Sequence, residues 1–259
     1  MKKRTLILTL AISVIMVFAL AGCGAAETEA TAPEKHPIAV AEGYETAQDD
    51  LGADAYDGWC DNPDTQYFAV NDYYNMESEG SLHILTNFET YQQTTEYTCG
   101  PSSAHMVINW FGGDIEKYDE MTIADITGCQ PNTGVLTSGL VKVFDEMGWE
   151  YTSNEDGEYY YETLEAFEAD VIKNIDAGVP MIIGWMDWGG HWEVIIGIDT
   201  MQEDNASDDV LIVADPYDTS DHYQDGYIVV PAERFFYMWN DIFPGDGLAQ
   251  AFITAQPAK

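Results

Sequence analysis

The sequence predicts an α+β domain in which helices come first and an antiparallel sheet follows. Between Cys99 and Ala177, apolar residues recur at the three- and four-residue spacing of amphipathic helices. From Val179 onwards the pattern changes to short runs of β-branched and aromatic residues bounded by Gly, Pro, Asn and Asp, which is typical of strands. Helices followed by a run of strands indicate an α+β fold rather than alternating parallel units.

The first predicted helix begins at Cys99. Pro101 suits its first turn, because the N–H that proline lacks would have no helical partner there. Apolar residues continue at helical spacing as far as Phe111, and two glycines then end the run. Further helices are expected over residues 121–127, from a cap at Thr137 or Ser138 to Gly148, over residues 163–177, and over residues 231–240.

The strands alternate with turns in the last third of the chain. The acidic segment Asp199–Asp209 separates two of them and is expected to be an exposed hairpin loop. Its carboxylates could bind calcium, although their spacing is not that of an EF-hand, and a solvated loop is the alternative. The expected strands are Val179–Trp185, His191–Ile198, Val210–Ala214, Gly226–Val230 and Ala249–Thr254.

Cys99 is the candidate nucleophile. A thiol at a helix N-terminus lies at the positive end of the helix dipole, which favours the thiolate. His191 stands at the head of an apolar strand, and Asp215 follows a second apolar run where Pro216 starts a turn. Cysteine, histidine and carboxylate in this order, with Gln93 six positions before the cysteine, are the components of a papain-type acyl-transfer site.

Two of these assignments have alternatives nearby in the sequence. Gln92 could take the place of Gln93, although the six-residue spacing favours Gln93. Asp187 or Asp199 could replace Asp215, whose assignment depends on its Asp-Pro context at a strand end.

The N-terminus predicts export. A basic segment, residues 2–4, precedes an uncharged and mostly apolar stretch, and the run Leu-Ala-Gly then leads to Cys23. This run resembles the lipobox of bacterial lipoproteins, which implies lipidation of Cys23 and a location on the outer face of the cell membrane. Ordinary signal cleavage or an uncleaved anchor are the alternatives. The expected organisation is a signal peptide over 1–23, a flexible tether over 24–55, an N-terminal extension over 56–81 and the main domain over 82–259.

Charge and cysteine content limit the possible partners. The net charge of −37, from 46 acidic and 9 basic residues, argues against nucleic-acid binding. With Cys23 and Cys99 assigned, Cys60 and Cys129 remain, and in an exported protein they could form a disulfide or stay as buried thiols. Because no zinc-ligand spacing occurs, no metal or other cofactor is expected.

Residues 85–253 resemble the papain-like cysteine peptidases related to cysteine peptidase family 39, and most closely its stand-alone exported branch. The resemblance implies that Cys99 is the nucleophile, His191 the general base and acid, Asp215 the residue that orients the imidazole, and Gln93 an oxyanion-hole donor beside the Cys99 backbone N–H. The segments that carry it are YQQTTEYTCGPSSAHMVINWFG, GVPMIIGW, GGHWEVIIGID and VADPYD.

The function implied is that of an exported, lipid-anchored cysteine hydrolase that cleaves peptide or other amide bonds through a thioester. Two alternatives remain on the same fold. One is a catalytically silent binding module at the cell surface. The other is an acyl-transfer enzyme of the cell-wall amidase or transglutaminase type.

Overall fold

The computed structural model describes residues 71–154, 160–185, 190–202, 205–218, 225–239 and 249–259 of the chain. The predicted signal peptide, its lipidation site Cys23, the tether and most of the extension lie outside these ranges. Cys60, Asp187 and the whole of residues 240–248 also lie outside them.

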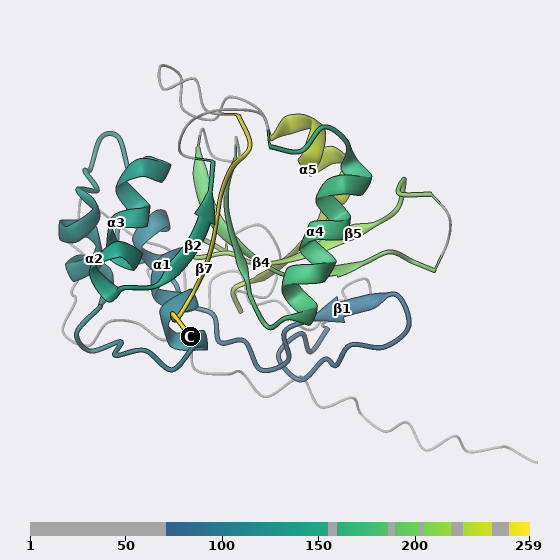
Figure 1. Cartoon of the computed structure of the whole chain (residues 1–259), viewed down its shortest axis with the longest axis horizontal. Coiled ribbons are helices and arrows are strands. Elements are labelled where there is room, and N and C mark those ends of the chain that lie inside the picture. Colours follow the sequence, from purple (N-terminus) through teal and green to yellow (C-terminus); the bar gives the residue numbers. More distant parts are fainter. Residues whose placement is uncertain (1–70, 155–159, 186–189, 203–204, 219–224, 240–248) are drawn as a thin grey trace, which may run out of the picture. The chain divides into compact units, whose positions relative to one another are not determined.

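The described strands form one seven-stranded antiparallel sheet with the order β2-β7-β3-β4-β5-β6, and β1 pairs with β4 (Figure 1). The strands are β1 (Leu82–Ile84), β2 (Glu150–Ser153), β3 (Met181–Trp185), β4 (His191–Asp199), β5 (Val210–Ala214), β6 (Tyr227–Pro231) and β7 (Ala251–Gln256).

Strand β4 is the centre of this sheet. One of its edges pairs with β5, and the other pairs first with β3 and then with β1. Residues His191 to Ile198 of β4 are all buried, because both faces of the strand are covered by helices. The first residue of β4, His191, pairs with Trp185 of β3, and the pairing of β4 with β5 begins at Val194.

Helices cover both faces of the sheet. The first three pack together on one side, where α1 contacts β4 and α3 contacts β2 and β7. On the other side α4 contacts β4 and β1, and α5 contacts β6 and α4 (Figure 1). The helices are α1 (Cys99–Trp110), α2 (Glu120–Thr127), α3 (Thr137–Met147), α4 (Leu164–Asp176) and α5 (Ala232–Met238).

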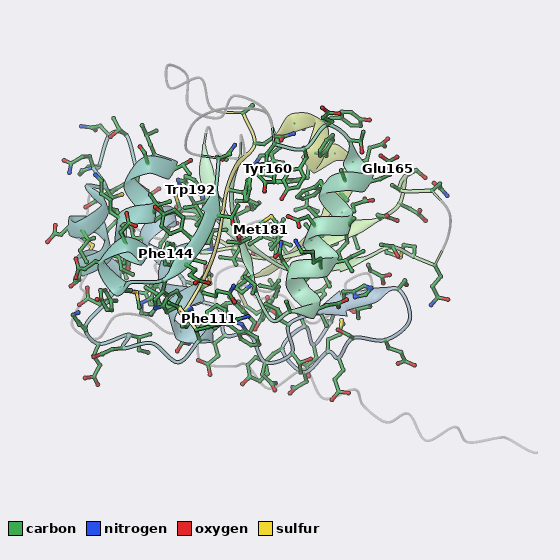
Figure 2. The ribbon with its side chains drawn as sticks, viewed as in Figure 1. Phe111, Phe144, Tyr160, Glu165, Met181 and Trp192 are labelled. Atoms are coloured by element: carbon green, nitrogen blue, oxygen red, sulfur yellow. The ribbon has the colours of Figure 1, made fainter. Side chains whose placement is uncertain are left out.

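The core lies between these layers. Phe144 of α3, Met181 of β3 and Trp192 of β4, which are labelled in Figure 2, are each at most 1% exposed. On the α4 side, the Trp239 indole N–H donates to the carbonyls of Gly184 and Ala251, 3.0 and 3.2 Å away. The strands β3 and β7 are thus linked to the segment that follows α5.

Most predicted elements are present, with differences at the cap of α3 and in strands β1 and β2, neither of which was predicted. The N-cap of α3 is Leu136 rather than Thr137 or Ser138, and no side chain caps this helix. Thr137 already has helical backbone and its side chain is fully buried, so it cannot cap from outside the helix. Strand β2 was not predicted, since its four residues alternate between exposed and half-buried positions at the edge of the sheet.

The helix ends follow the sequence signals closely. Gly128 and Gly148 end α2 and α3 in the left-handed conformation, with φ of 75° and 67°. Thr163 caps α4 by accepting the Ala166 N–H. Within the described ranges, none of the helices combines the length and the apolar character that a membrane span requires.

Candidate active site

Cys99 is the first residue of α1 and lies at the edge of a cleft. Its side chain is 9% exposed. The cleft is lined by Glu96 and Tyr97, by residues 131–135 of the connection between α2 and α3, and by Gly190 and Trp192 at the start of β4. A thiol at this position faces both the helix N-terminus and a space that a substrate can enter.

The segment before Cys99 is held by a buried carboxylate, that of Glu120 at the start of α2. Glu120 accepts hydrogen bonds from the Tyr91 hydroxyl at 2.9 Å, from the Thr94 N–H at 3.0 Å and from the Thr94 hydroxyl at 2.8 Å. The Thr98 hydroxyl donates to it as well. These donors lie on both sides of Gln93 and directly before Cys99 in the chain, so Glu120 sets the path of the loop that leads to the thiol.

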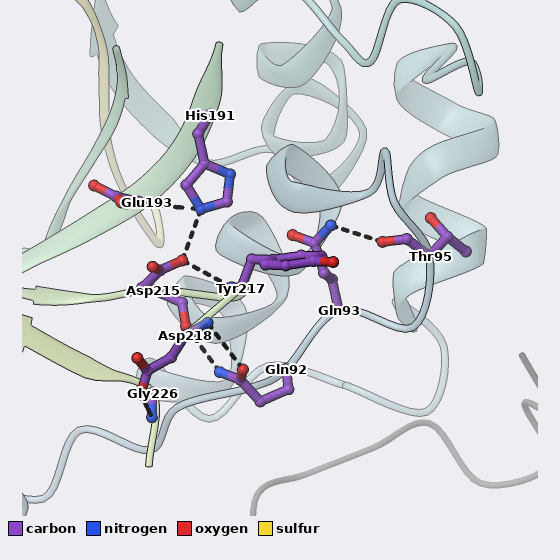
Figure 3. Close-up of polar contacts among 9 residues, drawn as sticks. All are labelled: Gln92, Gln93, Thr95, His191, Glu193, Asp215, Tyr217, Asp218 and Gly226. Carbon is purple, nitrogen blue, oxygen red and sulfur yellow. Dashed lines mark hydrogen bonds and ion pairs between the residues drawn. The ribbon is translucent and has the colours of Figure 1, made fainter. Parts of the chain in front are cut away.

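His191 is the first residue of β4 and is 3% exposed. Its Nε2 atom lies 2.7 Å from the Oδ1 atom of Asp215 (Figure 3). Burial by itself lowers the pKa of His191. The negative charge and hydrogen bond of Asp215, followed by the hydrogen bond and charge of Cys99, outweigh burial and raise this pKa well above its usual range. Nε2 is taken by Asp215, so Nδ1 is the nitrogen left for the thiol.

Asp215 follows the last residue of β5 and is 1% exposed. Its Oδ1 atom also accepts the Tyr217 N–H at 2.7 Å. Gln92 braces this turn from the neighbouring loop: its amide donates to the Asp215 carbonyl at 2.8 Å and accepts the Asp218 N–H at 3.1 Å (Figure 3). Both ends of the Gln92 amide therefore bond to the turn.

Gln93 is buried next to this turn. Its backbone N–H donates to the Pro216 carbonyl at 2.8 Å, and its side-chain Nε2 donates to the Thr95 carbonyl at 2.7 Å. The amide carries a second N–H, so one donor remains for an oxyanion. The oxyanion role of Gln93 stays a prediction.

Asp218 and Gly226 complete the support of the turn. The Gly226 N–H donates to Asp218 Oδ2 at 2.9 Å, and the Gly226 carbonyl accepts the Asp215 N–H at 2.9 Å. Gly226 has a φ of 81°, and a Cβ atom there would lie 2.5 Å from the Thr90 side chain. Only glycine meets both conditions without a shift in the backbone.

A second buried carboxylate, that of Glu193, lies beside the histidine. Glu193 Oε1 is 3.9 Å from His191 Nε2, and its side chain is fully buried. Ligand atoms of His191, Glu193 and Asp215 all lie within 4.8 Å of one another, close enough to hold a metal ion. In the structure Nε2 is paired with Asp215 through the hydrogen bond of 2.7 Å.

The structure also places the other candidates. Asp199, at the far end of β4, accepts the Ser81 hydroxyl and the Met201 N–H and lies away from His191. Cys129 is a buried free thiol that donates to the Tyr97 carbonyl at 3.2 Å. Because Cys60 is outside the described residues, its disulfide with Cys129 stays a prediction.

Sequence analysis missed two carboxylates at this site. Glu193 had a detectable signal, since it is an acidic residue two positions after His191 in an otherwise apolar strand. Glu120 had none, because an acidic residue in the first turn of a helix is ordinarily a solvated partner of the helix dipole.

Helices packed on an antiparallel sheet, with a cysteine at the head of the first helix and a histidine at the head of a central strand, define the papain-like class of cysteine peptidases. The model of the Peptidase_C39 like family matches residues 85–242, and the chain belongs to this family. It is thus related to cysteine peptidase-type hydrolases. No curated protein matches the chain.

Proposed function

We propose that the protein is an exported, lipid-anchored hydrolase that cleaves peptide or other amide bonds with Cys99, His191 and Asp215. The observation that carries this proposal is the contact of 2.7 Å between His191 Nε2 and Asp215 Oδ1. It turns the other ring nitrogen towards the thiol at the head of α1. The thiol would then face one ring nitrogen and the orienting acid the other, which is the arrangement that acyl transfer requires.

The chemistry would run in two halves. The Cys99 thiolate attacks the carbonyl carbon of the substrate, and the Cys99 backbone N–H and the Gln93 amide stabilise the oxyanion. The C–N bond then breaks, and the imidazolium of His191 gives its proton to the leaving amine. In the second half, neutral His191 takes a proton from water, the resulting hydroxide attacks the thioester, and the acid product leaves Cys99.

Asp215 would serve this cycle by keeping the His191 ring in one orientation while the ring gains and loses its proton. The carboxylate itself accepts the Tyr217 N–H, and Gln92 holds the backbone carbonyl of the same residue. A histidine oriented by a buried carboxylate stays in line with the thiol through both halves of the reaction.

The test is covalent trapping from a library of peptides and cell-wall fragments, with the mass of the acyl-enzyme read out. Wild-type protein should form an acyl adduct on Cys99, and His191→Ala should form almost none. Cys99→Ala is the control for adducts elsewhere. Wild-type-like turnover by His191→Ala would contradict the proposal. Transfer of the acyl group to an amine rather than water would identify an acyl transferase instead.

We propose the membrane anchor on the sequence pattern before Cys23, because small residues followed by cysteine after an apolar stretch are typical of lipidated export signals. Cys23→Ser should release the protein from membranes or block its processing. Unchanged membrane association and signal cleavage in that variant would count against the anchor.

A further inference from the structure

The Nε2 edge of His191 faces two carboxyl groups from different parts of the chain. Asp215 comes from the turn after β5 and lies 2.7 Å from Nε2. Glu193 comes from β4 itself, two residues after the histidine, and lies 3.9 Å from the same atom. Alternate residues of a strand share a face, so the strand itself directs Glu193 to the side of the sheet that His191 occupies. Figure 3 shows both carboxyl groups turned towards the ring.

Burial of the ionised Glu193 side chain has a large desolvation cost. Its side chain is fully buried, and its partner across the strand pair is the apolar Ile183 of β3. A carboxylate buried in such surroundings is strongly disfavoured without a cationic or hydrogen-bonding partner. The protonated His191 ring, with Nε2 3.9 Å from Glu193 Oε1, is one of the partners within reach of this carboxyl group. Leucine or isoleucine would fit the strand pattern at position 193 without this cost.

Three ionisable groups face the His191 ring from the described elements packed around it. These are Cys99 from α1, Asp215 from the end of β5 and Glu193 from β4 itself. The two carboxyl groups stand on the Nε2 side, away from the nitrogen that is left for the thiol. A negative charge there is nearer to the imidazolium than to the thiolate, so it favours the charged Cys–His pair over the neutral one.

We propose that Glu193 is a second positioning residue for His191, which acts with Asp215 to hold the ring and to keep it protonated opposite the Cys99 thiolate. This inference rests on the proposed function, since it assigns Glu193 a role only through the Cys99–His191 pair.

The test needs no substrate. The rate at which iodoacetate alkylates Cys99 is measured from pH 4 to 10 in the full chain. The reagent is an anion, so it reacts fastest while the thiolate and the imidazolium coexist, and its rate falls when His191 loses its proton. In Glu193→Gln this alkaline limb should move to lower pH by about one unit. A single charge at this distance shifts a pKa by about one to three units, and the smaller value is expected because the closer Asp215 remains.

Two further variants guard against indirect effects. Glu168→Gln removes another buried carboxyl group, on α4, and should leave the limb where it is. Glu193→Leu removes the carboxyl group in a form suited to the apolar strand, and it decides the question if Glu193→Gln does not fold. Circular dichroism establishes the fold of each variant.

The outcomes separate this inference from the proposed function. If His191→Ala abolishes the alkaline limb and removal of the Glu193 carboxyl group lowers it, both stand. If His191→Ala abolishes the limb but folded Glu193 variants keep it at the wild-type pH, the role of Glu193 is overturned and the proposed function survives. If His191→Ala leaves the limb intact, the Cys99–His191 pair is refuted.

Discussion

Replacing Glu120 with alanine should destabilise the domain far more than the loss of an ordinary helix charge. The change removes the acceptor of the Thr94 N–H, the Thr94 hydroxyl and the Tyr91 hydroxyl, and the Thr98 hydroxyl keeps only its contact of 2.7 Å with Thr95. A buried donor without a partner costs about 1–3 kcal/mol. Relief of the buried charge offsets part of the sum, and the expected net loss is about 3 kcal/mol or more.

Urea unfolding of the full chain measures this loss, and Glu165→Ala is the matched control. Glu165 is also acidic and also lies in the first turn of a helix, α4, but it is exposed. Its removal costs the interaction with the helix dipole and the solvent-exposed contacts with its own N–H and with Thr163, which together should be a small loss. A loss for Glu120→Ala no greater than that for Glu165→Ala would refute the reasoning that the Glu120 network holds the loop. Because that loop carries Gln93 and Cys99, the rate of Cys99 alkylation should fall as well.

Burial and, next, the charge of Asp209 raise the pKa of Glu168 to about 7 from its ordinary 4.5. Protonated Glu168 therefore stabilises the folded domain fully below pH 4.5, and this stabilisation is lost as the pH rises through 7. Glu168→Gln should therefore flatten the decline in urea midpoint between pH 5 and pH 8, and parallel curves would contradict this. Gln93→Ala should lower kcat on the order of 10²–10³ if its amide completes the oxyanion hole, and a loss below about threefold would remove it from that role. Burial, then the charge of Cys99, raises the pKa of Cys129 to about 12, so limited alkylation followed by peptide mapping should label Cys99 first, and the reverse order would contradict the nucleophile assignment.

Local signals in the sequence were enough to predict the elements that present the nucleophile and base. The helix from Cys99 follows from apolar spacing within a dozen residues, and the strand from His191 follows from a run that is apolar apart from Glu193. The cap of α3 was wrong because Thr137 and Leu136 differ in backbone conformation, which composition does not reveal. Strand β2 is short and polar, and its partner comes about a hundred residues later.

The support of the site depends on contacts between distant segments. Glu120 can accept hydrogen bonds from the loop that contains Thr94 only because α2 packs against that loop. Glu193 and Asp215 lie near the same nitrogen of His191 only because β4 pairs with β5. Spacing along the chain does not encode such contacts, so Glu120 could not be assigned before the fold was known, and Glu193 showed only as an acidic residue in an apolar strand.

One wall of the cleft is a small turn, residues 130–134, that precedes the Val135 carbonyl to which the Trp192 indole N–H donates. In the connection between α2 and α3, the backbones of Gln130 and Gly134 bond to each other in both directions, and the side chains of residues 131–133 project into solvent beside Cys99. The braces of Asp215 come from the opposite direction, through Gln92 and Tyr217. Substitutions or insertions in this small turn should therefore alter which substrates fit while leaving the reacting groups in register. Related enzymes that differ only in this turn should therefore differ in substrate specificity. The same turn is the first segment to randomise when a new specificity is sought.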